Sequence, residues 1–382
     1  AAKSVSPASP LGEKHIFENQ TVKLGTTTWR RSSPMPAWRH PESGESRRTA
    51  AALPECGILF VIMTTKLRAN RVRRTYLGGG RIDAFTGFAP DCSDGVPRPE
   101  DWLASTTTAF NGTREIAGEG LGRLEDGRLV KDAVGTLPIL VKLLDSDERL
   151  VVQAHPTVPC ARAKFNSPVG KTECWYFLDG TAPDACVYLG FKPGVTRAAW
   201  RAAFEAQRGI LDMLHRVPVR AGDFVFVDGG VPHAIGGGCF MVELQEPSDL
   251  MVVAERVTPS GRTIPEAKLH GGVGFETMFD VYEYKGFAYD DLCAKYVRRR
   301  GKCAGGNGVV ERILGPELTE KFAMWRVAGG GRLPLARPAC VAVVTGGAGT
   351  VNGVAVQKGD RLVVADEAAV AVAGAAEVVV CV

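Results

Sequence analysis

The stretch that decides the fold is Val151-Val152-Gln153-Ala154-His155-Pro156. A β-strand alternates its side chains between two faces, so Gln153 and His155 project to one side while Val152 and Ala154 project to the other. Burying two polar side chains within an otherwise apolar strand costs free energy unless a partner satisfies them. A divalent metal ion would satisfy both side chains. The stretch therefore predicts a strand that contributes to a metal site.

Two later segments offer ligand atoms of the same kind. Lys171-Thr172-Glu173 provides a carboxylate, and Pro232-His233, which follows Gly222-Asp223, provides a second imidazole. A lone histidine at a strand end is more often a structural residue than a ligand. Only the combination of these segments favours metal binding at His155.

Length and composition describe an ordinary globular protein. The chain has 382 residues, of which 45% are hydrophobic and 23% charged, and a formal net charge of +4. This length predicts two domains. The mild positive charge suits an anionic small-molecule substrate and does not indicate nucleic acid binding.

The cysteines and the apolar runs bear on the cellular compartment. The ten cysteines include no Cys-x-x-Cys pair, which favours reduced thiols and a cytoplasmic protein. The apolar run 57–63 is too short to cross a bilayer, so no membrane association is expected.

Changes in composition and in apolar patterning divide the sequence into four parts. Residues 1–62 are rich in Ser, Thr, Pro and Arg and are expected to be a poorly ordered extension. Residues 63–265 should form the catalytic domain, 266–307 a helical connecting segment, and 308–382 a smaller β-sandwich. The apolar spacing of 196–214 predicts a helix inserted among the strands of the catalytic domain. Its strands are predicted at 137–144, 150–155, 174–178, 185–189, 224–227 and 240–244.

The second histidine lies in a pattern with a known structural meaning. Gly222, followed after five residues by Asp228-x-Gly230-x-x-His233, resembles the second cupin motif, in which a glycine turn precedes a strand that ends at a metal-binding histidine. The motif usually has Pro where this chain has Asp228. The turn at Gly229-Gly230 should bring His233 to the barrel mouth, where it can meet His155.

A longer ordered series resembles one enzyme family within the cupins. The series consists of 70–79, 99–102, 137–142, the Gln-x-His pair and 171–176, and it resembles type I mannose-6-phosphate isomerase over residues 63–290. The C-terminal β segment is similar to the second cupin-like domain of that family. The resemblance implies a mainly β protein, with a cupin (jelly-roll) catalytic domain that carries helical insertions. It implies interconversion of mannose 6-phosphate and fructose 6-phosphate through a cis-enediol(ate).

The resemblance also implies a ligand set, namely Gln153, His155, Glu173 and His233, and zinc as the metal. From the residues alone, cobalt, manganese, nickel or iron would suit such mixed nitrogen and oxygen ligation equally well.

Three further residues are implied as parts of the site. Glu243 matches a position proposed for the base that moves the proton between carbons, across an expected hairpin at 236–238. Lys171 would contact a substrate oxygen or the phosphate, and Asp249 would lie beside the substrate. Glu243 could instead be an ordinary salt-bridged carboxylate, and Lys171 an exposed lysine.

One position departs from the family pattern. Where the family carries an arginine thought to serve isomerisation and phosphate binding, this chain has Val253. Arg256, as a catalytic group, and Arg262, as a substrate-binding group, are the nearest replacements, although a solvated role for Arg256 is the simpler interpretation.

Three functions are compatible with these features. The favoured one is the metal-dependent isomerase acting on a small sugar phosphate. The alternative is a non-catalytic cupin that senses or regulates by binding sugar phosphates, which Val253 favours. A cupin oxygenase is disfavoured, because it would prefer an all-histidine iron site over one with Gln153 and Glu173. The sequence makes no prediction about oligomeric state.

Overall fold

The computed structural model describes residues 63–110, 116–299 and 308–382. The first sixty-two residues, with their predicted disorder, lie outside this range. The described chain is mainly β and forms four antiparallel sheets, which confirms the predicted fold class.

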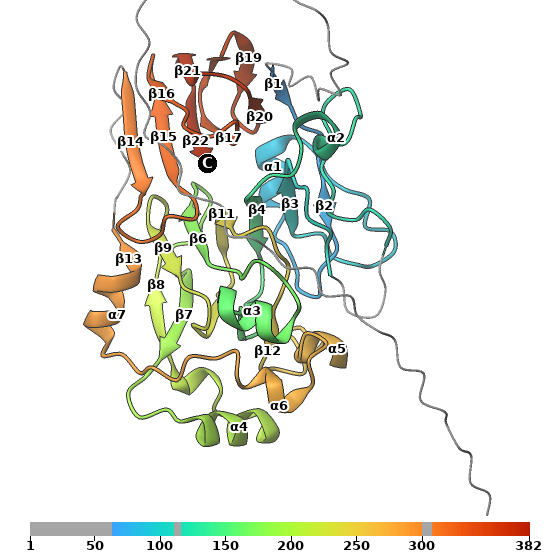
Figure 1. Ribbon diagram of the computed structural model, residues 1–382, viewed down its shortest axis with the longest axis vertical. Helices are drawn as coiled ribbons and strands as arrows, with labels where there is room; N and C mark the ends of the chain where they lie inside the picture. The colour runs from blue at the N-terminus through green and yellow to red at the C-terminus, as the bar shows by residue number, and fades with distance from the viewer. Residues whose placement is uncertain (1–62, 111–115, 300–307) are drawn as a thin grey trace, which may run out of the picture. The chain divides into compact units, whose positions relative to one another are not determined.

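The first pair of sheets holds the predicted metal-binding strands (Figure 1). The seven-stranded sheet has the order β13 (Val297–Arg298), β9 (Phe224–Val227), β6 (Glu173–Phe177), β11 (Cys239–Gln245), β4 (Leu140–Ser146), β3 (Glu100–Leu103) and β2 (Arg71–Val72). The five-stranded sheet has the order β12 (Val252–Val253), β5 (Gln153–Ala154), β10 (His233–Ile235), β7 (Cys186–Phe191) and β8 (Leu214–Pro218). Apolar side chains from both sheets join one core cluster, so the sheets pack against each other as a sandwich.

The second pair of sheets is built mostly from the C-terminal strands, drawn in orange and red in Figure 1. Its six-stranded sheet has the order β1 (Met63–Lys66), β20 (Arg361–Ala365), β17 (Ala339–Gly346), β22 (Glu377–Cys381), β15 (Met324–Ala328) and β14 (Val309–Leu314). Its four-stranded sheet has the order β16 (Arg332–Pro334), β21 (Ala369–Gly374), β18 (Ala348–Val351) and β19 (Val354–Gln357). Strand β1 therefore pairs within the C-terminal sheet, although it directly precedes the segment of the first sandwich in sequence.

The six-stranded sheet is buried on both faces. In β17, Val341 and Val343 join the core of the first sandwich, whereas Cys340 and Val344 join the core of the second. This follows from the alternation of side chains along a strand. Its near-continuous apolar sequence thus has a structural reason, which is burial on two sides.

Short helices connect the strands of the first sandwich. They are α1 (Arg81–Thr86), α2 (Val130–Val134), α3 (Val158–Lys164), α4 (Arg197–Ala206), the 3-10 turn η1 (Leu211–Met213), α5 (Glu266–Leu269), α6 (Phe275–Met278) and α7 (Tyr289–Tyr296). Trp200 and Phe204 of α4 share an apolar cluster with Met278 and with Val252 of β12, which holds α4 and α6 against the five-stranded sheet. Within the described residues, none of these helices has the length and apolar character to cross a bilayer.

Two sequence predictions need correction. The helix expected over 196–214 ends at Ala206, because Gln207 (φ 48°) and Gly209 (φ 75°) adopt left-handed conformations that a helix cannot continue. The expected hairpin at 236–238 is instead a crossing between two sheets, since β10 lies in the five-stranded sheet and β11 in the seven-stranded sheet. A Cβ atom on Gly236 would collide with the carbonyl of Cys186, so this crossing requires a glycine.

Candidate metal centre and cavity

Three buried ligand-type side chains meet between the two sheets of the first sandwich. They come from the residue after β5, the first residue of β6 and the first residue of β10, and are His155, Glu173 and His233. One ligand atom from each lies within 4.8 Å of the others, and each residue is at most 1% exposed. The turn before β10 brings the histidines together, because the Gly230 N–H donates to the His155 carbonyl at 2.7 Å.

Backbone contacts orient both imidazoles. Nδ1 of His155 lies 2.8 Å from the Leu250 carbonyl, and Nδ1 of His233 lies 2.9 Å from the Val231 carbonyl. A carbonyl only accepts, so each Nδ1 carries the proton and each Nε2 presents a lone pair. These lone pairs face the Glu173 carboxylate, at 3.1 Å from His155 and 3.2 Å from His233.

This donor set fits a cation. Oε2 of Glu173 and Nε2 of His233 are buried atoms without a hydrogen-bond partner among the described residues. Leaving such atoms unsatisfied is costly, and a divalent ion between them would satisfy both.

The charge states agree with a ligand role. Burial and the neighbouring Lys171 lower the pKa of His155 to about 3, so its imidazole is neutral at physiological pH. For Glu173, burial opposes ionisation, but Lys171 and the two histidines hold its pKa well below the usual range. Lys171 lies 2.8 Å from Nε2 of His155 and 3.2 Å from Oε2 of Glu173. A neutral imidazole at His155 and an ionised carboxylate at Glu173 are the forms that bind a metal.

Gln153 is brought to the same place by strand register. It pairs with His233 of β10 on one side and with Val253 of β12 on the other, so the three side chains share a face of the five-stranded sheet. Gln153 is 8% exposed and lines the cavity into which Glu173 projects. Val253, where an arginine was expected, lines this cavity too and is fully buried.

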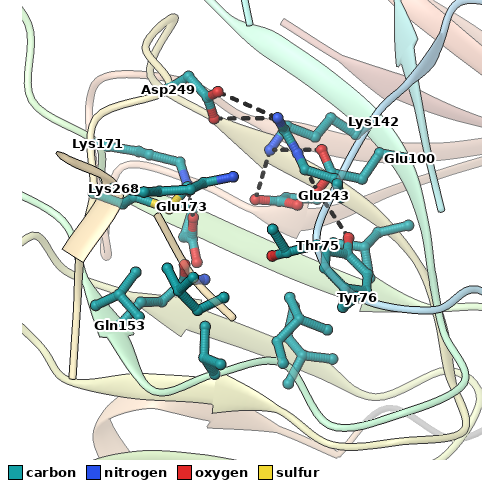
Figure 2. Close-up of a pocket in the computed structure, with 18 residues that line it drawn as sticks. Thr75, Tyr76, Glu100, Lys142, Gln153, Lys171, Glu173, Glu243, Asp249 and Lys268 are labelled. Atoms are coloured by element: carbon teal, nitrogen blue, oxygen red, sulfur yellow. Dashed lines mark hydrogen bonds and ion pairs between the residues drawn. The ribbon is translucent and has the colours of Figure 1, made fainter. Parts of the chain in front are cut away.

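We call this space the central cavity; Figure 2 shows the side chains that line it. Both sheets, three loops and helix α5 contribute to its polar lining, which consists of Arg74, Thr75, Tyr76, Glu100, Lys142, Gln153, Lys171, Glu173, Glu243, Asp249 and Lys268.

Glu243 enters the cavity from the seven-stranded sheet. Its Oε1 lies 3.4 Å from Nζ of Lys142, whereas its Oε2 is buried and has no hydrogen-bond partner among the described residues. Burial raises the pKa of Glu243 to about 7, against the opposing attraction of Lys142. A buried carboxyl with one unoccupied oxygen and a pKa near neutrality has the properties of a proton-transfer group.

Glu100 organises the neighbouring wall of the cavity. Its carboxylate accepts hydrogen bonds from Arg74 at 2.9 Å, Tyr76 at 2.8 Å and Trp102 at 2.7 Å. Burial would favour its neutral form, but Arg74 and Lys142 lower its pKa well below the usual range. Glu100 is therefore ionised and fully engaged, so of the two carboxyls that face each other across Lys142, Glu243 is the one with an oxygen that has no hydrogen-bond partner.

The structure brings some of the remaining predicted residues to the cavity. Lys171 and Asp249 line it, and Asp249 accepts hydrogen bonds from Arg74 at 3.2 Å and from the Phe110 N–H at 2.8 Å.

Two predicted arginines are not brought to the cavity. The Arg256 guanidinium lies over the rings of Phe204, at 4.8 Å, and Phe275, at 5.4 Å, so cation–π contacts hold it away. Arg262 lines a separate pocket beside Arg71 and Asp83. Neither side chain therefore replaces the arginine that was expected at the position of Val253.

Four charged residues of the cavity were missed as functional residues from the sequence: Arg74, Glu100, Lys142 and Lys268. Arg74 follows Arg71 and Arg73 in a basic stretch of the sequence, yet it is only 6% exposed. A detectable signal existed for Lys142, which is a charged residue inside the apolar run of β4, in a sheet that is buried on both sides.

Comparisons with known proteins agree with this geometry. No protein-family model matches the chain. Among curated proteins, it is 42% identical over 113 residues to mannose-6-phosphate isomerase ManA of Bacillus subtilis, a match that covers 29% of this chain and 35% of that protein. It is 36% identical over 113 residues to mannose-6-phosphate isomerase of Streptococcus mutans, covering 29% of this chain and 34% of that protein. The matched segment thus spans about a third of the length of these curated relatives.

Solved structures share the whole described fold. Mannose 6-phosphate isomerase from Bacillus subtilis superimposes with a TM-score of 0.61 at 17% identity, covering 84% of this chain and 99% of that one. A putative mannosephosphate isomerase from Archaeoglobus fulgidus gives a TM-score of 0.60 at 16% identity, covering 85% of this chain and 99% of that one. The predicted cupin fold and the resemblance to mannose-6-phosphate isomerases are thereby confirmed.

Proposed function

We propose that this protein is a metal-dependent aldose–ketose isomerase that interconverts mannose 6-phosphate and fructose 6-phosphate. One observation carries the proposal: Glu173, which converges with His155 and His233, lines the same cavity as Glu243, a carboxyl whose pKa is near 7 and whose Oε2 has no hydrogen-bond partner among the described residues. Isomerisation needs these two elements, since it must stabilise a developing enediolate and move a proton between adjacent carbons.

We propose that Gln153, His155, Glu173 and His233 hold the metal and that the metal is zinc. The mixed imidazole and oxygen donors support this choice. A divalent cation there would polarise the substrate carbonyl and stabilise the negative charge that develops as the proton leaves carbon.

Glu243 is the proposed base. Its free Oε2 can accept the proton from C2 of the aldose and return it to C1, and its pKa near neutrality allows both transfers. Lys142, 3.4 Å from the other oxygen, holds the carboxylate in place. Lys171 is suited to contact a sugar oxygen beside the metal ligands, and Asp249 holds Arg74 at the edge of the substrate space.

The charges of the cavity support a phosphorylated substrate. Its described lining contains four cationic residues (Arg74, Lys142, Lys171, Lys268) and four acidic residues (Glu100, Glu173, Glu243, Asp249). These charges cancel when all are ionised, so a divalent ion would leave about two positive charges, which the dianion of a phosphate ester balances. We propose the cytoplasm as the compartment, which is supported by the free state of the described cysteines.

A coupled assay beside elemental analysis tests this function. The full-length protein should form fructose 6-phosphate from mannose 6-phosphate, contain about one equivalent of divalent metal, and lose activity with a chelator. Activity should return when zinc is added. A fully metallated protein without turnover would contradict the proposal.

A second candidate is a non-catalytic module that binds sugar phosphates. Val253 favours it, because a neutral side chain stands where the resembling family carries an arginine assigned to isomerisation and phosphate binding. Binding of mannose 6-phosphate by the metallated protein, with no exchange of the C2 proton into solvent, would select this candidate over the isomerase.

A further inference from the structure

Lys268 is a cation that the proposed chemistry does not use. It lies on the short helix α5 and is 4% exposed, which is rare for a lysine without an ionic partner. Figure 2 shows its side chain extending over Glu173 into the central cavity. Together with Arg74 and Thr75 it also lines an adjoining outer pocket. Lys268 therefore stands where the cavity of the metal ligands meets the outer pocket.

The ammonium group of Lys268 has no side-chain hydrogen bond or ion pair among the residues that the structure describes. Its backbone N–H closes the turn to the Pro265 carbonyl at 2.9 Å. The charged groups around it are Arg74, Asp249, Glu100 and Glu119. Asp249 and Glu100 are already occupied by Arg74, at 3.2 Å and 2.9 Å, so neither is left to pair with the lysine.

The surroundings of Lys268 penalise its positive charge. Burial, and then the nearby Arg74 guanidinium, lower the pKa of Lys268 to about 8, against weaker attraction from Asp249. An anion beside the ammonium would remove this penalty. The site thus favours an anionic ligand with some of its charge close to both Lys268 and Arg74.

We propose that Lys268 binds the phosphate group of the substrate and thereby sets the preference for a phosphorylated over a free sugar. This inference rests on the proposed isomerase function and deepens it. In a hexose 6-phosphate the phosphate is at the end of the molecule opposite C1 and C2, so with C1 and C2 at the metal ligands the phosphate would point toward another part of the cavity lining, where Lys268 and Arg74 lie. Lys268 then supplies the positive charge that Val253 does not, from a different part of the chain. Lys171 remains free for the sugar end.

Substitution of Lys268 tests the proposal by its selectivity. Lys268→Met keeps the length of the side chain and removes its charge, Lys268→Arg restores a charge, and Lys164→Met removes one charge from the exposed ion pair with Asp280 as a matched control. The full-length proteins are compared with mannose 6-phosphate, mannose and inorganic phosphate. For Lys268→Met, kcat/KM for mannose 6-phosphate should fall about 10- to 100-fold, as expected for a charged hydrogen bond, and much less for mannose.

The affinity for inorganic phosphate should change among the variants in the same way as kcat/KM for mannose 6-phosphate. By calorimetry, Lys268→Met should weaken the affinity for inorganic phosphate about tenfold or more, while Lys268→Arg restores much of it and Lys164→Met leaves it unchanged. Equal losses with both sugars, or unaltered phosphate affinity in Lys268→Met, would overturn the proposal.

A measurement on the unaltered protein covers the case in which the variant fails to fold. Amine labelling with mass spectrometry should show that inorganic phosphate protects Lys268 and leaves Lys164 reactive; equal labelling with and without phosphate would also refute the proposal. If a protein without turnover still bound phosphate through Lys268, this inference would be supported. The proposed isomerase function would then be contradicted.

Discussion

The two β-sandwiches share an architecture and differ in what they bury. The first encloses the charged side chains of the central cavity, which include Glu173, Lys142 and Glu243. In the second, the core between the two sheets consists of apolar side chains, mainly valines. The buried arginines of its strands are paired with carboxylates, Arg326 with Glu377 at 2.7 Å and Arg361 with Asp101 at 3.5 Å. Because burying charge costs several kcal/mol per ion, its concentration in one sandwich marks where the chemistry lies.

The difference between the two sandwiches begins with the residues that their strands bury. In the C-terminal sandwich, β17 buries apolar residues on both faces. In the first sandwich, β4 places Lys142 and β11 places Glu243 as register partners facing the cavity, with apolar neighbours on the opposite face. A few polar positions per strand are enough to build a site, because the apolar remainder of each strand still contributes to the core. The same fold therefore serves as a site in one half and as a support in the other.

The largest effect is expected from the metal ligands. His233→Ala should remove the metal and lower kcat about 10⁴-fold, since the loss of metal polarisation costs several kcal/mol of transition-state stabilisation. Elemental analysis and the coupled assay measure the two losses together. Stoichiometric metal in this variant would contradict the assignment of His233.

The next effect concerns proton transfer. Glu243→Gln should retain the metal yet lower kcat about 10³-fold, because the amide cannot accept the proton. In the unaltered protein, kcat/KM should fall as the pH drops through the pKa of Glu243, which is about 7 before the positive metal lowers it. The base works only when deprotonated, so activity is present above this pKa and lost below it. The residual activity of the Gln variant should lack this acidic limb, and unchanged C2 proton exchange would exclude Glu243 as the base.

A smaller effect, on stability alone, is expected in the six-stranded sheet that lies between the two cores. Val343→Ala and Val344→Ala, which face the first and second cores, should each lower the free energy of unfolding by about 2 kcal/mol without changing kcat. The exposed Val310→Ala is the matched control and should cost less than about 0.5 kcal/mol. Denaturant unfolding measures all three. A large loss of kcat in Val344→Ala would show that the second core is not merely a support.

The smallest effect is expected at Arg256. Its guanidinium lies over Phe204 and Phe275, outside the cavity, so Arg256→Ala should change kcat/KM by less than about twofold. A tenfold loss of kcat/KM would show that Arg256 has a functional role. It would also show that functional residues extend beyond the central cavity.

Much of the fold was predictable because strand signals are local. The strand predicted at 224–227 coincides with β9, and most others agree with the observed strands to within one to three residues. The helix over 196–214 was too long because spacing alone does not reveal the left-handed turn at Gln207. The crossing at 236–238 was mistaken for a hairpin, since glycines serve both and only the sheet assignment distinguishes them.

The site was predictable where its residues interrupt apolar strands or match a motif. Gln153, His155, Glu173 and His233 stand out in this way. In the structure the ligand atoms of His155, Glu173 and His233 converge, and Gln153 is the register partner of His233, whereas metal binding by the four stays a prediction. Arg74 and Lys268 were missed because they come from loops and a short helix, where a basic residue usually faces solvent. Their burial results from long-range packing, which the local sequence does not encode.

Anomalous diffraction from crystals of the full-length protein tests the central claim most directly. Data on both sides of the absorption edge of the bound metal should show one peak between the sheets, about 2.0–2.2 Å from Nε2 of His155, Nε2 of His233 and a carboxylate oxygen of Glu173. A metal-containing crystal without a peak at this position, or with the two imidazoles turned away from each other, would contradict the account.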